Sequence, residues 1–197
     1  MSRPLQGLIL AAGASNRMGQ PKANLKLNQM TCLEVIVRQL ATVCQQVTIV
    51  SGAHFETIRK MHPHLNIVRS RSWRRGMRAS LRDGVRSIPK GDILLTHCDR
   101  PGVEQGTIDR LINTHGFRPR VPMYRGLGGH PVWIPEWLRP RLLEDDGAPL
   151  RTVLRNANFE SVFAPDLGIQ CNLNHRQDWF RFRAEQRKCF GSLASNE

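Results

Sequence analysis

A run of small residues near the start of the chain, followed by two cations, has the composition of a phosphate-binding loop. The apolar run Leu5–Leu10 gives way to the small residues Ala11–Ser15, and Arg17 and Lys22 follow at fixed spacing. Gly13 has no Cβ that would keep a ligand away from the backbone. Backbone N–H groups in such a loop can point at phosphate oxygens, and the two cations supply the opposite charge. We therefore expect a buried strand that ends in a polyphosphate-binding loop.

A second polar cluster follows another apolar run. Asp92–Thr96 has the composition of a strand, and His97, Cys98 and Asp99 come directly after it. A carboxylate at a strand end suits Mg²⁺, which prefers one or two carboxylates together with substrate phosphates. Ligands of open α/β sheets gather at the carboxyl ends of the strands, so we expect the Gly13 loop and Asp99 to share one site. The structural alternative is that Asp99 caps the next helix or stabilises the turn.

Several blocks of the chain resemble, in the same order, the motifs of one enzyme family. The first segment reads Leu10-Ala-Ala-Gly-Ala-Ser-Asn-Arg-Met-Gly-Gln-Pro-Lys22. It resembles the signature Leu-Ala-Ala-Gly-x-Ser-x-Arg-Met-Gly-x-x-Lys of the molybdenum cofactor nucleotidyltransferases, in the nucleoside-triphosphate transferase superfamily. Similar blocks are Gly76-Met-Arg-Ala-Ser-Leu-Arg-Asp-Gly84, Cys98-Asp-Arg-Pro101 and Gly128-Gly-His-Pro-Val132. The resemblance extends from about Leu5 to Asp178.

The resemblance implies an activity and a role for each matching residue. The implied reaction moves CMP from CTP, favoured over GMP from GTP, to the phosphate of molybdopterin and releases pyrophosphate, with Mg²⁺ as cofactor. The implied nucleotide-binding residues are Leu10, Ala11, Ala12, Gly13, Ser15, Arg17, Lys22, Gly76 and Ser80. The implied catalytic residues are Arg17, Lys22 and Asp99, the metal ligands Asp99 and Asn172, and the acceptor-binding residues Gly129, His130 and Pro131.

Two parts of the chain disagree about the donor base. Asn172 and Asn174 match the Asn-x-Asn of the guanylyl branch, where the cytidylyl branch carries an aspartate as second metal ligand. An amide oxygen ligates Mg²⁺ more weakly than a carboxylate does. Ala12 matches the cytidylyl branch, because the guanylyl enzymes carry a second glycine that gives room for a purine edge. We favour CTP as the donor.

Two further functions stay open. One is nucleotidyl transfer to a sugar phosphate or a methylerythritol phosphate. The other is a noncatalytic carrier of the molybdenum cofactor, which the loss of the second metal aspartate at Asn172 motivates. Two side-chain roles are structural alternatives: His130 could fix its own loop, and Asp145 or Asp146 is expected to cap the helix that follows.

The elements that must position these residues alternate between apolar runs and segments of helical period, which predicts a layered α/β domain. Strands are expected near Leu5–Leu10, Val47–Ser51, Leu65–Arg69, Asp92–Thr96, Arg120–Tyr124, Pro131–Ile134, Ser161–Ala164 and Gly168–Cys171. Helices are expected near Thr31–Cys44, His54–Met61, Arg78–Ile88, Val103–His115, Glu136–Leu143, Pro149–Asn156 and His175–Lys188. The predicted fold is α/β, a single three-layer Rossmann-like nucleotidyltransferase domain (glycosyltransferase-A-like) with a mostly parallel mixed sheet over 1–190, followed by a disordered tail at 191–197.

The amino-acid composition limits the possible binding partners and the cellular location. The 197 residues carry a formal net charge of +13, which favours polyanions. Aromatic residues are few, and this argues against nucleic acid, whose bases usually stack on exposed aromatics. Five separated cysteines without a Cys-x-x-Cys pair are typical of reduced thiols and a cytoplasmic location. No apolar run approaches the ~20 residues of a membrane helix. The expected partners are a nucleoside triphosphate, a molybdopterin-type acceptor and a molybdenum enzyme that receives the product.

Overall fold

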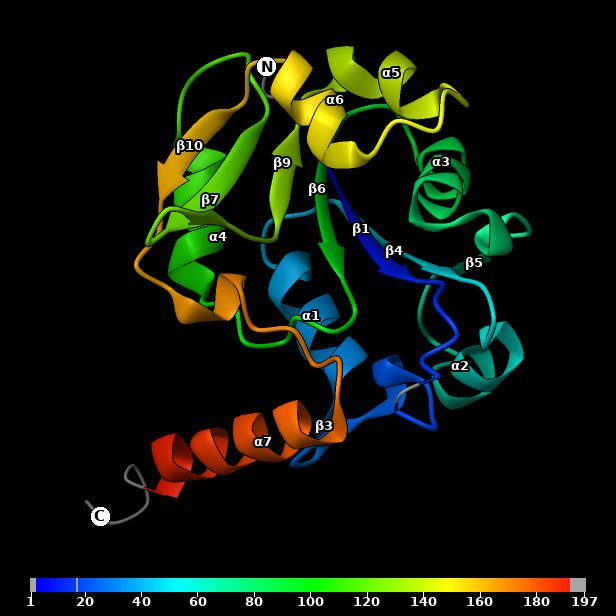
Figure 1. Ribbon diagram of the computed structural model, residues 1–197, viewed down its shortest axis with the longest axis vertical. Coiled ribbons are helices and arrows are strands. Elements are labelled where there is room, and N and C mark those ends of the chain that lie inside the picture. The colour runs from blue at the N-terminus through cyan, green and yellow to red at the C-terminus, as the bar shows by residue number, and fades with distance from the viewer. Residues whose placement is uncertain (1–2, 17, 192–197) are drawn as a thin grey trace.

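In the computed structural model, which describes residues 3–16 and 18–191, eight strands form one mixed sheet with helices on both faces (Figure 1). The strands of this sheet are β1 (Leu5–Ala11), β4 (Gln46–Ser51), β5 (Ile67–Arg69), β6 (Asp92–His97), β7 (Arg120–Tyr124), β8 (Leu127–Gly128), β9 (Val132–Ile134) and β10 (Glu160–Phe163). A separate small hairpin pairs β2 (Lys26–Leu27) with β3 (Met30–Thr31). The helices are α1 (Cys32–Ala41), α2 (Phe55–Met61), α3 (Met77–Ser87), α4 (Gln105–Asn113), α5 (Arg139–Leu143), α6 (Leu150–Asn156) and α7 (Arg176–Gly191).

The strand order places β1 at the point where the chain changes direction across the sheet. The order is β10-β7-β9-β6-β1-β4-β5, with β8 paired to β7. The strands β5, β4, β1 and β6 are parallel, whereas β9 is antiparallel to both β6 and β7. From β1 the chain first builds outward through β4 and later returns to the other side of β1 as β6. In open α/β sheets such a switch point, at the carboxyl ends of the strands, is where ligands bind.

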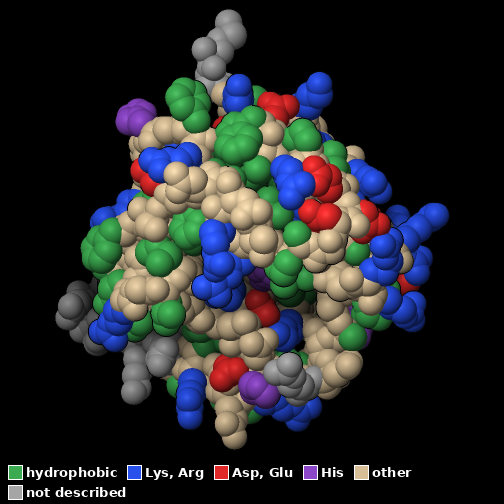
Figure 2. All heavy atoms as spheres, turned by 45° about the horizontal axis from the view of Figure 1, so that its top comes forward, with side chains coloured by type: hydrophobic (Ala, Val, Ile, Leu, Met, Phe, Trp, Pro, Cys, Tyr) green, Lys and Arg blue, Asp and Glu red, His purple; other side chains and the backbone are tan. Residues whose placement is uncertain are grey.

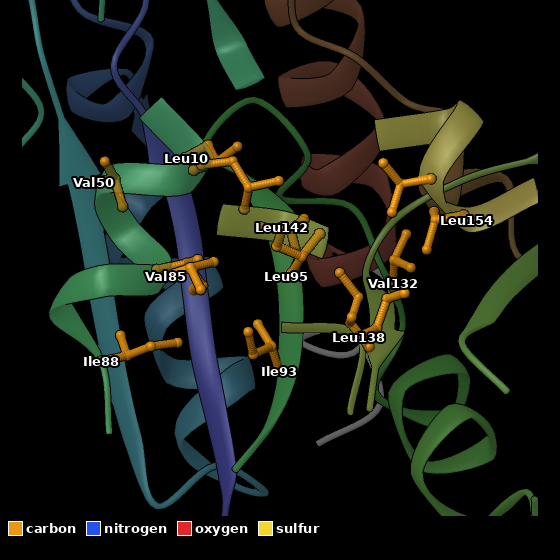
Figure 3. Close-up of a cluster of buried hydrophobic side chains, with 14 of the residues drawn as sticks. Leu10, Val50, Val85, Ile88, Ile93, Leu95, Val132, Leu138, Leu142 and Leu154 are labelled. Carbon is orange, nitrogen blue, oxygen red and sulfur yellow. The ribbon is translucent and has the colours of Figure 1, made fainter. Parts of the chain in front are cut away.

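Alternating side chains along the strands supply two cores, one on each face of the sheet. Leu8 and Leu10 of β1 lie in the core under α3, α5 and α6, much of which Figure 3 shows. Ile9 and Ala11 point the opposite way, into the core under α1, α2 and α4. Successive side chains on a strand point to opposite faces, so one apolar strand serves both layers. The predicted three-layer α/β domain with a mostly parallel sheet is confirmed.

The start of α1 shows how local sequence sets a boundary. The Thr31 hydroxyl oxygen accepts a hydrogen bond from the backbone N–H of Glu34 at 3.2 Å. In return the Glu34 carboxylate accepts the backbone N–H of Thr31 at 2.7 Å. This reciprocal pair is a capping box, which satisfies two amides that the helix itself leaves unpaired. The helix expected from about Thr31 therefore begins where this cap sets its boundary.

Two predictions about the later part of the chain are wrong. The strand expected at Gly168–Cys171 is a 3₁₀ helix over Leu167–Ile169. Asp166 determines this, because its Oδ1 accepts the N–H of Gly168 at 2.7 Å while Oδ2 accepts the Thr107 hydroxyl at 2.7 Å. Within the loop before α6, Asp146 accepts the N–H of Ala148, and Asp145 pairs with arginines, so neither caps that helix.

The C-terminal segment lies outside the three layers and leads into α7, below the sheet in Figure 1. Phe182 of this helix packs with Met18, Leu25 and Leu173 in a third apolar cluster. Gly191 is the last residue of α7, and the rest of the tail predicted at 191–197 lies outside the described residues. Across the described ranges, the helices include none with the length and apolarity that crossing a membrane requires.

Close packing of α3 on the sheet gives a test of the fold. A Cβ at Gly84 would lie 2.5 Å from Val50 Cγ2 and 3.1 Å from Leu8 Cδ1. We expect Gly84→Ala to lower the free energy of unfolding by about 1–3 kcal/mol, because the added methyl overpacks the core. The matched control is Gly106→Ala in α4, where a Cβ would meet no described atom within 4 Å. Urea unfolding of the two variants measures the difference, and equal stability would contradict this packing of α3.

Candidate functional site

A cleft of about 730 Å³ opens at the carboxyl ends of β1, β4 and β6. Its walls come from the loop after β1, the segment that leads into α3, and the residues that follow β6. Figure 2 shows a hollow in the face it draws, with acidic, basic and histidine side chains around it. The expectation that the Gly13 loop and Asp99 would share one site is met, because both line this cleft.

The loop after β1 leaves open space where a ligand would approach. A Cβ at Gly13 would meet no described atom within 4 Å, so the fold itself does not require glycine there. Ser15 has a positive φ of 51°, and its carbonyl accepts the N–H of Met18 at 2.9 Å. Its hydroxyl oxygen accepts the N–H of Lys22 at 3.3 Å. This turn brings the chain back over the strand end and sets Lys22 beside the cleft.

Lys22 joins the three segments of the site through its ammonium group. Its Nζ lies 2.8 Å from Oδ2 of Asp99 and 2.5 Å from Oδ1 of Asn174. The side chains of Lys22 and Asp99 are 14% and 16% exposed, so this pair is largely shielded from solvent. The backbone N–H of Leu173 donates to the Asp99 carbonyl at 3.0 Å, which sets the C-terminal segment in register with the end of β6. The Asp99 carboxylate oxygen and the Asn174 amide oxygen thus converge on the Lys22 ammonium group.

These oxygens have the chemistry of a magnesium site completed by substrate. Across residues 3–16 and 18–191, no group of three or more His, Cys, Asp or Glu side chains is arranged to hold a metal ion. Mg²⁺ is commonly held by one or two protein oxygens, with phosphates and water filling its other positions. Asp99 and Asn174 supply such oxygens, and they already converge on a positive charge. The donor set therefore fits Mg²⁺.

Asn174, and not the predicted Asn172, lies beside Lys22. Asn174 lines the cleft, whereas Asn172 is not among the described lining residues and its Oδ1 is buried without a described hydrogen-bond partner. Leu173, between the two asparagines, is buried in the apolar cluster with Met18. The metal role predicted for Asn172 stays a prediction.

The start of α3 forms the opposite wall. Gly76 has φ of +100°, a conformation that side chains rarely adopt, and a Cβ there would meet no described atom within 4 Å. Ser80 lines the cleft but is only 2% exposed, and its hydroxyl lies 3.3 Å from the Ser70 hydroxyl. The predicted nucleotide-binding residues that line the cleft are Leu10, Ala11, Ala12, Gly13, Ser15, Lys22, Gly76 and Ser80. Arg17, also predicted for this site, lies outside the described residues.

The loop predicted to bind the acceptor packs against the rest of the protein. Gly129 and Pro131 are buried, and none of Gly129, His130 and Pro131 is among the described lining residues. Any side chain at Gly129 would overlap the backbone of Ile169. The His130 ring lies edge-on against His97 at 4.5 Å, with Nδ1 3.3 Å from the Leu95 carbonyl. Burial holds the pKa of His130 well below its ordinary value, so the ring is neutral near pH 7. The acceptor-binding role predicted for Gly129, His130 and Pro131 stays a prediction.

Several lining residues were not predicted. Trp73, Arg74 and Met77 stand beside Gly76, and the sequence signal that could have identified them was their place next to that glycine. His54 also lines the cleft, with Nε2 2.7 Å from the Ala14 carbonyl. Cys98 lines it too, and burial raises the pKa of this thiol, which keeps it protonated and unreactive.

Comparison with known proteins gives a family and several relatives. Residues 7–162 match the model of the MobA-like NTP transferase domain. The molybdenum cofactor cytidylyltransferase of Escherichia coli K12 is 24% identical over 153 residues, which cover 76% of this chain and 78% of that protein. Nicotine blue oxidoreductase of Paenarthrobacter nicotinovorans is 34% identical over 148 residues, covering 68% and 72%. A probable molybdenum cofactor guanylyltransferase of Bacillus mycoides KBAB4 is 23% identical over 183 residues, covering 88% of each chain.

Solved structures share the fold over nearly the whole chain. A nucleotidyl transferase from Methanothermobacter has a TM-score of 0.78 at 24% identity, covering 92% of this chain and 97% of that one. A manganese complex of a Mycobacterium tuberculosis H37Rv protein has a TM-score of 0.71 at 21% identity, covering 92% and 98%. The predicted nucleotidyltransferase fold is confirmed.

A substitution at Gly13 distinguishes a role in ligand binding from a role in folding. We expect Gly13→Ala to leave the melting temperature of the free protein within about 2 °C of the wild type, because the added methyl enters open space. We expect the same variant to lose roughly tenfold or more in nucleoside triphosphate affinity, a change of about 1.4 kcal/mol or more. Thermal unfolding with and without nucleotide measures both effects. A large loss of stability without nucleotide would show that Gly13 serves the fold.

Proposed function

The chain belongs to the MobA-like NTP transferase family, and from this premise we propose that it transfers a nucleoside monophosphate to the phosphate of a molybdopterin-type acceptor. The donor is a nucleoside triphosphate and the second product is pyrophosphate. The observation that carries the proposal is the meeting of Lys22, Asp99 and Asn174 opposite the open Gly13 loop. The names of the cytidylyltransferase and guanylyltransferase relatives support the choice of acceptor.

The proposed chemistry needs charge neutralisation and alignment rather than a general base. A phosphate oxygen of the acceptor is anionic near neutral pH, and it attacks the α-phosphorus of the donor while the bond to the β-phosphate breaks. Negative charge then passes to the departing pyrophosphate, which Lys22 and the backbone amides of the Gly13 loop stabilise. Mg²⁺, when bound by Asp99 and Asn174, supplies further charge neutralisation at the reacting phosphates. Holding both substrates in one cleft provides the alignment for in-line displacement.

The same contacts imply that Lys22 changes partners during the reaction. In the free protein its ammonium group lies against both Asp99 and Asn174. Asp99 and Asn174 would hold the metal, which would supply charge neutralisation, and the Lys22 ammonium group would then contact the phosphates of the donor.

CTP is the proposed donor, with Ala12 as the residue that sets the preference. Ala12 lines the cleft and is 7% exposed, so its methyl group takes up space at the loop. We expect Ala12→Gly to raise the ratio of GTP to CTP in donor use by about tenfold, since removing one methyl is worth ~1–3 kcal/mol in discrimination. Competition between the two triphosphates in one reaction measures the ratio. An unchanged ratio would remove Ala12 from the proposal.

A redox reaction is the second candidate, because the 34% identical relative is named nicotine blue oxidoreductase. Such a reaction needs an electron carrier and no transfer of a phosphate group. A redox reaction gives the paired side chains of Lys22 and Asp99 no evident role, whereas transfer of a phosphate group uses both side chains.

Loss of the central charges tests the proposed activity. We expect Asp99→Asn and Lys22→Met each to lower kcat/KM for pyrophosphate release by roughly a hundredfold or more, about 2.7 kcal/mol of transition-state stabilisation. The assay contains Mg²⁺, a molybdopterin acceptor and each of CTP, GTP, UTP and ATP in turn. Asp109→Asn in α4 is the control, since Asp109 is not among the described lining residues. Turnover within about threefold of wild type for Asp99→Asn or Lys22→Met would overturn these roles.

Other acceptors and a carrier role are distinguished in the same assay. If a methylerythritol phosphate or a sugar phosphate replaced molybdopterin with equal kcat/KM, that compound would become the assigned acceptor. Tight molybdopterin binding without pyrophosphate release from any triphosphate would indicate a carrier instead.

A further inference from the structure

The segment between β5 and α3 places an unassigned aromatic side chain on the wall of the cleft. Trp73 and Arg74 belong to a 3₁₀ helix over Trp73–Arg75 and both line the cleft beside Gly76. Trp73 is half-buried and Arg74 is exposed. The mechanism above uses neither side chain.

The Cβ and Cγ atoms of Trp73 pack directly against Gly52, which follows β4. A Cβ at Gly52 would lie 2.6 Å from Trp73 Cβ, 2.7 Å from Trp73 Cγ and 2.6 Å from the Ala12 carbonyl oxygen. Because Gly52 has no side chain, Trp73 and the loop after β1 can approach each other. The indole therefore stands next to the residue proposed to set the donor base.

An acidic clamp holds the segment on the N-terminal side of Trp73. One carboxylate oxygen of Asp83 accepts hydrogen bonds from the Ser70 hydroxyl at 2.7 Å and the Ser72 hydroxyl at 2.6 Å. The backbone N–H of Ser72 lies 3.3 Å from the same oxygen. Burial opposes ionisation of Asp83, but these hydrogen bonds from Ser72 and Ser70 outweigh it and lower the pKa of the carboxyl group. The clamp is therefore charged at neutral pH.

Ion pairs hold the segment on the other side. Arg75 lies 2.8 Å from Asp145, and the buried Arg82 of α3 pairs with the same carboxylate. The Arg74 guanidinium lies 4.6 Å from the centre of the Trp73 ring, within the range of a cation–π contact. Trp73 is consequently held in place before any ligand arrives.

The position of Trp73 matches the nucleoside end of the donor. Gly52 follows β4, on one side of β1, while Asp99 follows β6 on the other side. A triphosphate that crosses the Gly13 loop toward Asp99 leaves its base on the Trp73 side. Stacking on an aromatic side chain adds affinity and accepts any base, because every base has a π-face.

We propose that Trp73 is the platform on which the donor nucleobase stacks, which supplies affinity for nucleosides without choosing between them. This role rests on the proposed function, in which the cleft binds a nucleoside triphosphate. It divides recognition into two parts, with stacking by Trp73 and selection by the Ala12 loop.

Binding of three Mg²⁺-loaded ligands tests the proposal by calorimetry: CTP, GTP and inorganic tripolyphosphate, which has no base. We expect Trp73→Ala to raise the Kd of CTP and of GTP about tenfold or more, and Trp73→Phe to raise each by about threefold or less. The Kd of tripolyphosphate should stay within about twofold in both variants, which also reports that the site is folded. The control is Trp137→Ala, an indole that is 48% exposed and outside the described cleft lining.

A spectroscopic readout keeps the test independent of the alanine variant. Stacking should quench the indole, so CTP should quench the fluorescence of the wild type and of Trp137→Phe, and this quench should be lost in Trp73→Phe. A quench that persists in Trp73→Phe overturns the proposal, as does an equal loss of CTP and tripolyphosphate affinity in Trp73→Ala.

The outcomes separate this inference from the proposed function. A wild type that binds CTP through Trp73 but releases no pyrophosphate contradicts the transferase proposal alone. A wild type that binds and transfers, with unchanged CTP affinity in Trp73→Ala, contradicts the stacking alone. A wild type that binds none of the triphosphates contradicts both.

Discussion

The contact of the Lys22 ammonium group with Asp99 and Asn174 is the constraint on which the site depends. Lys22 contacts Asp99, which is 77 positions away in sequence, and Asn174, which is 152 positions away. These contacts connect the loop after β1 to the end of β6 and to the C-terminal segment. A charged pair that is largely shielded from water is favourable only when its partners are in place, because removing either one leaves a charge unpaired. The same three groups then supply, in the proposed reaction, one cation for phosphate and two oxygens for a metal.

Much of this arrangement could be predicted because it follows from local sequence. The alternation of Leu8, Ile9 and Leu10 in a run without charge indicates a central strand covered on both faces, and a parallel sheet brings the ends of such strands together. That rule alone was enough to place Gly13 and Asp99 in one cleft. Thr31, three residues before Glu34, likewise marks the start of its helix.

The failures share a cause, which is that tertiary contacts decided the outcome. Short apolar segments such as Gly168–Cys171 have no period that distinguishes strand from helix, and Asp166 settled the matter through bonds to Gly168 and to Thr107. The position of Asn174 beside Lys22 depends on a contact between residues 152 positions apart, which sequence spacing does not contain.

The basic composition has a partly structural explanation. Arg78 donates to the carbonyls of Leu142, Arg141 and Ala148 at the end of α5 and just beyond it. Arg139 donates to carbonyls at the end of α3, and Arg120 to those of Leu111 and Gly116 at and after the last turn of α4. Helix ends leave carbonyls unpaired and carry partial negative charge, which suits guanidinium groups. Several arginines thus cap helices from elsewhere in the chain. Figure 2 shows basic side chains in several places on the face it draws.

The fate of the α-phosphate tests the central claim most directly. The measurement is to incubate the protein with Mg²⁺, molybdopterin and CTP labelled with ³²P at the α-phosphate, and to separate the products. The account predicts that the label moves into a dinucleotide with the pterin, and that the unlabelled β- and γ-phosphates leave as pyrophosphate. Label that stays in intact CTP, with GTP, UTP and ATP labelled in the same way also inactive as donors, would contradict the account.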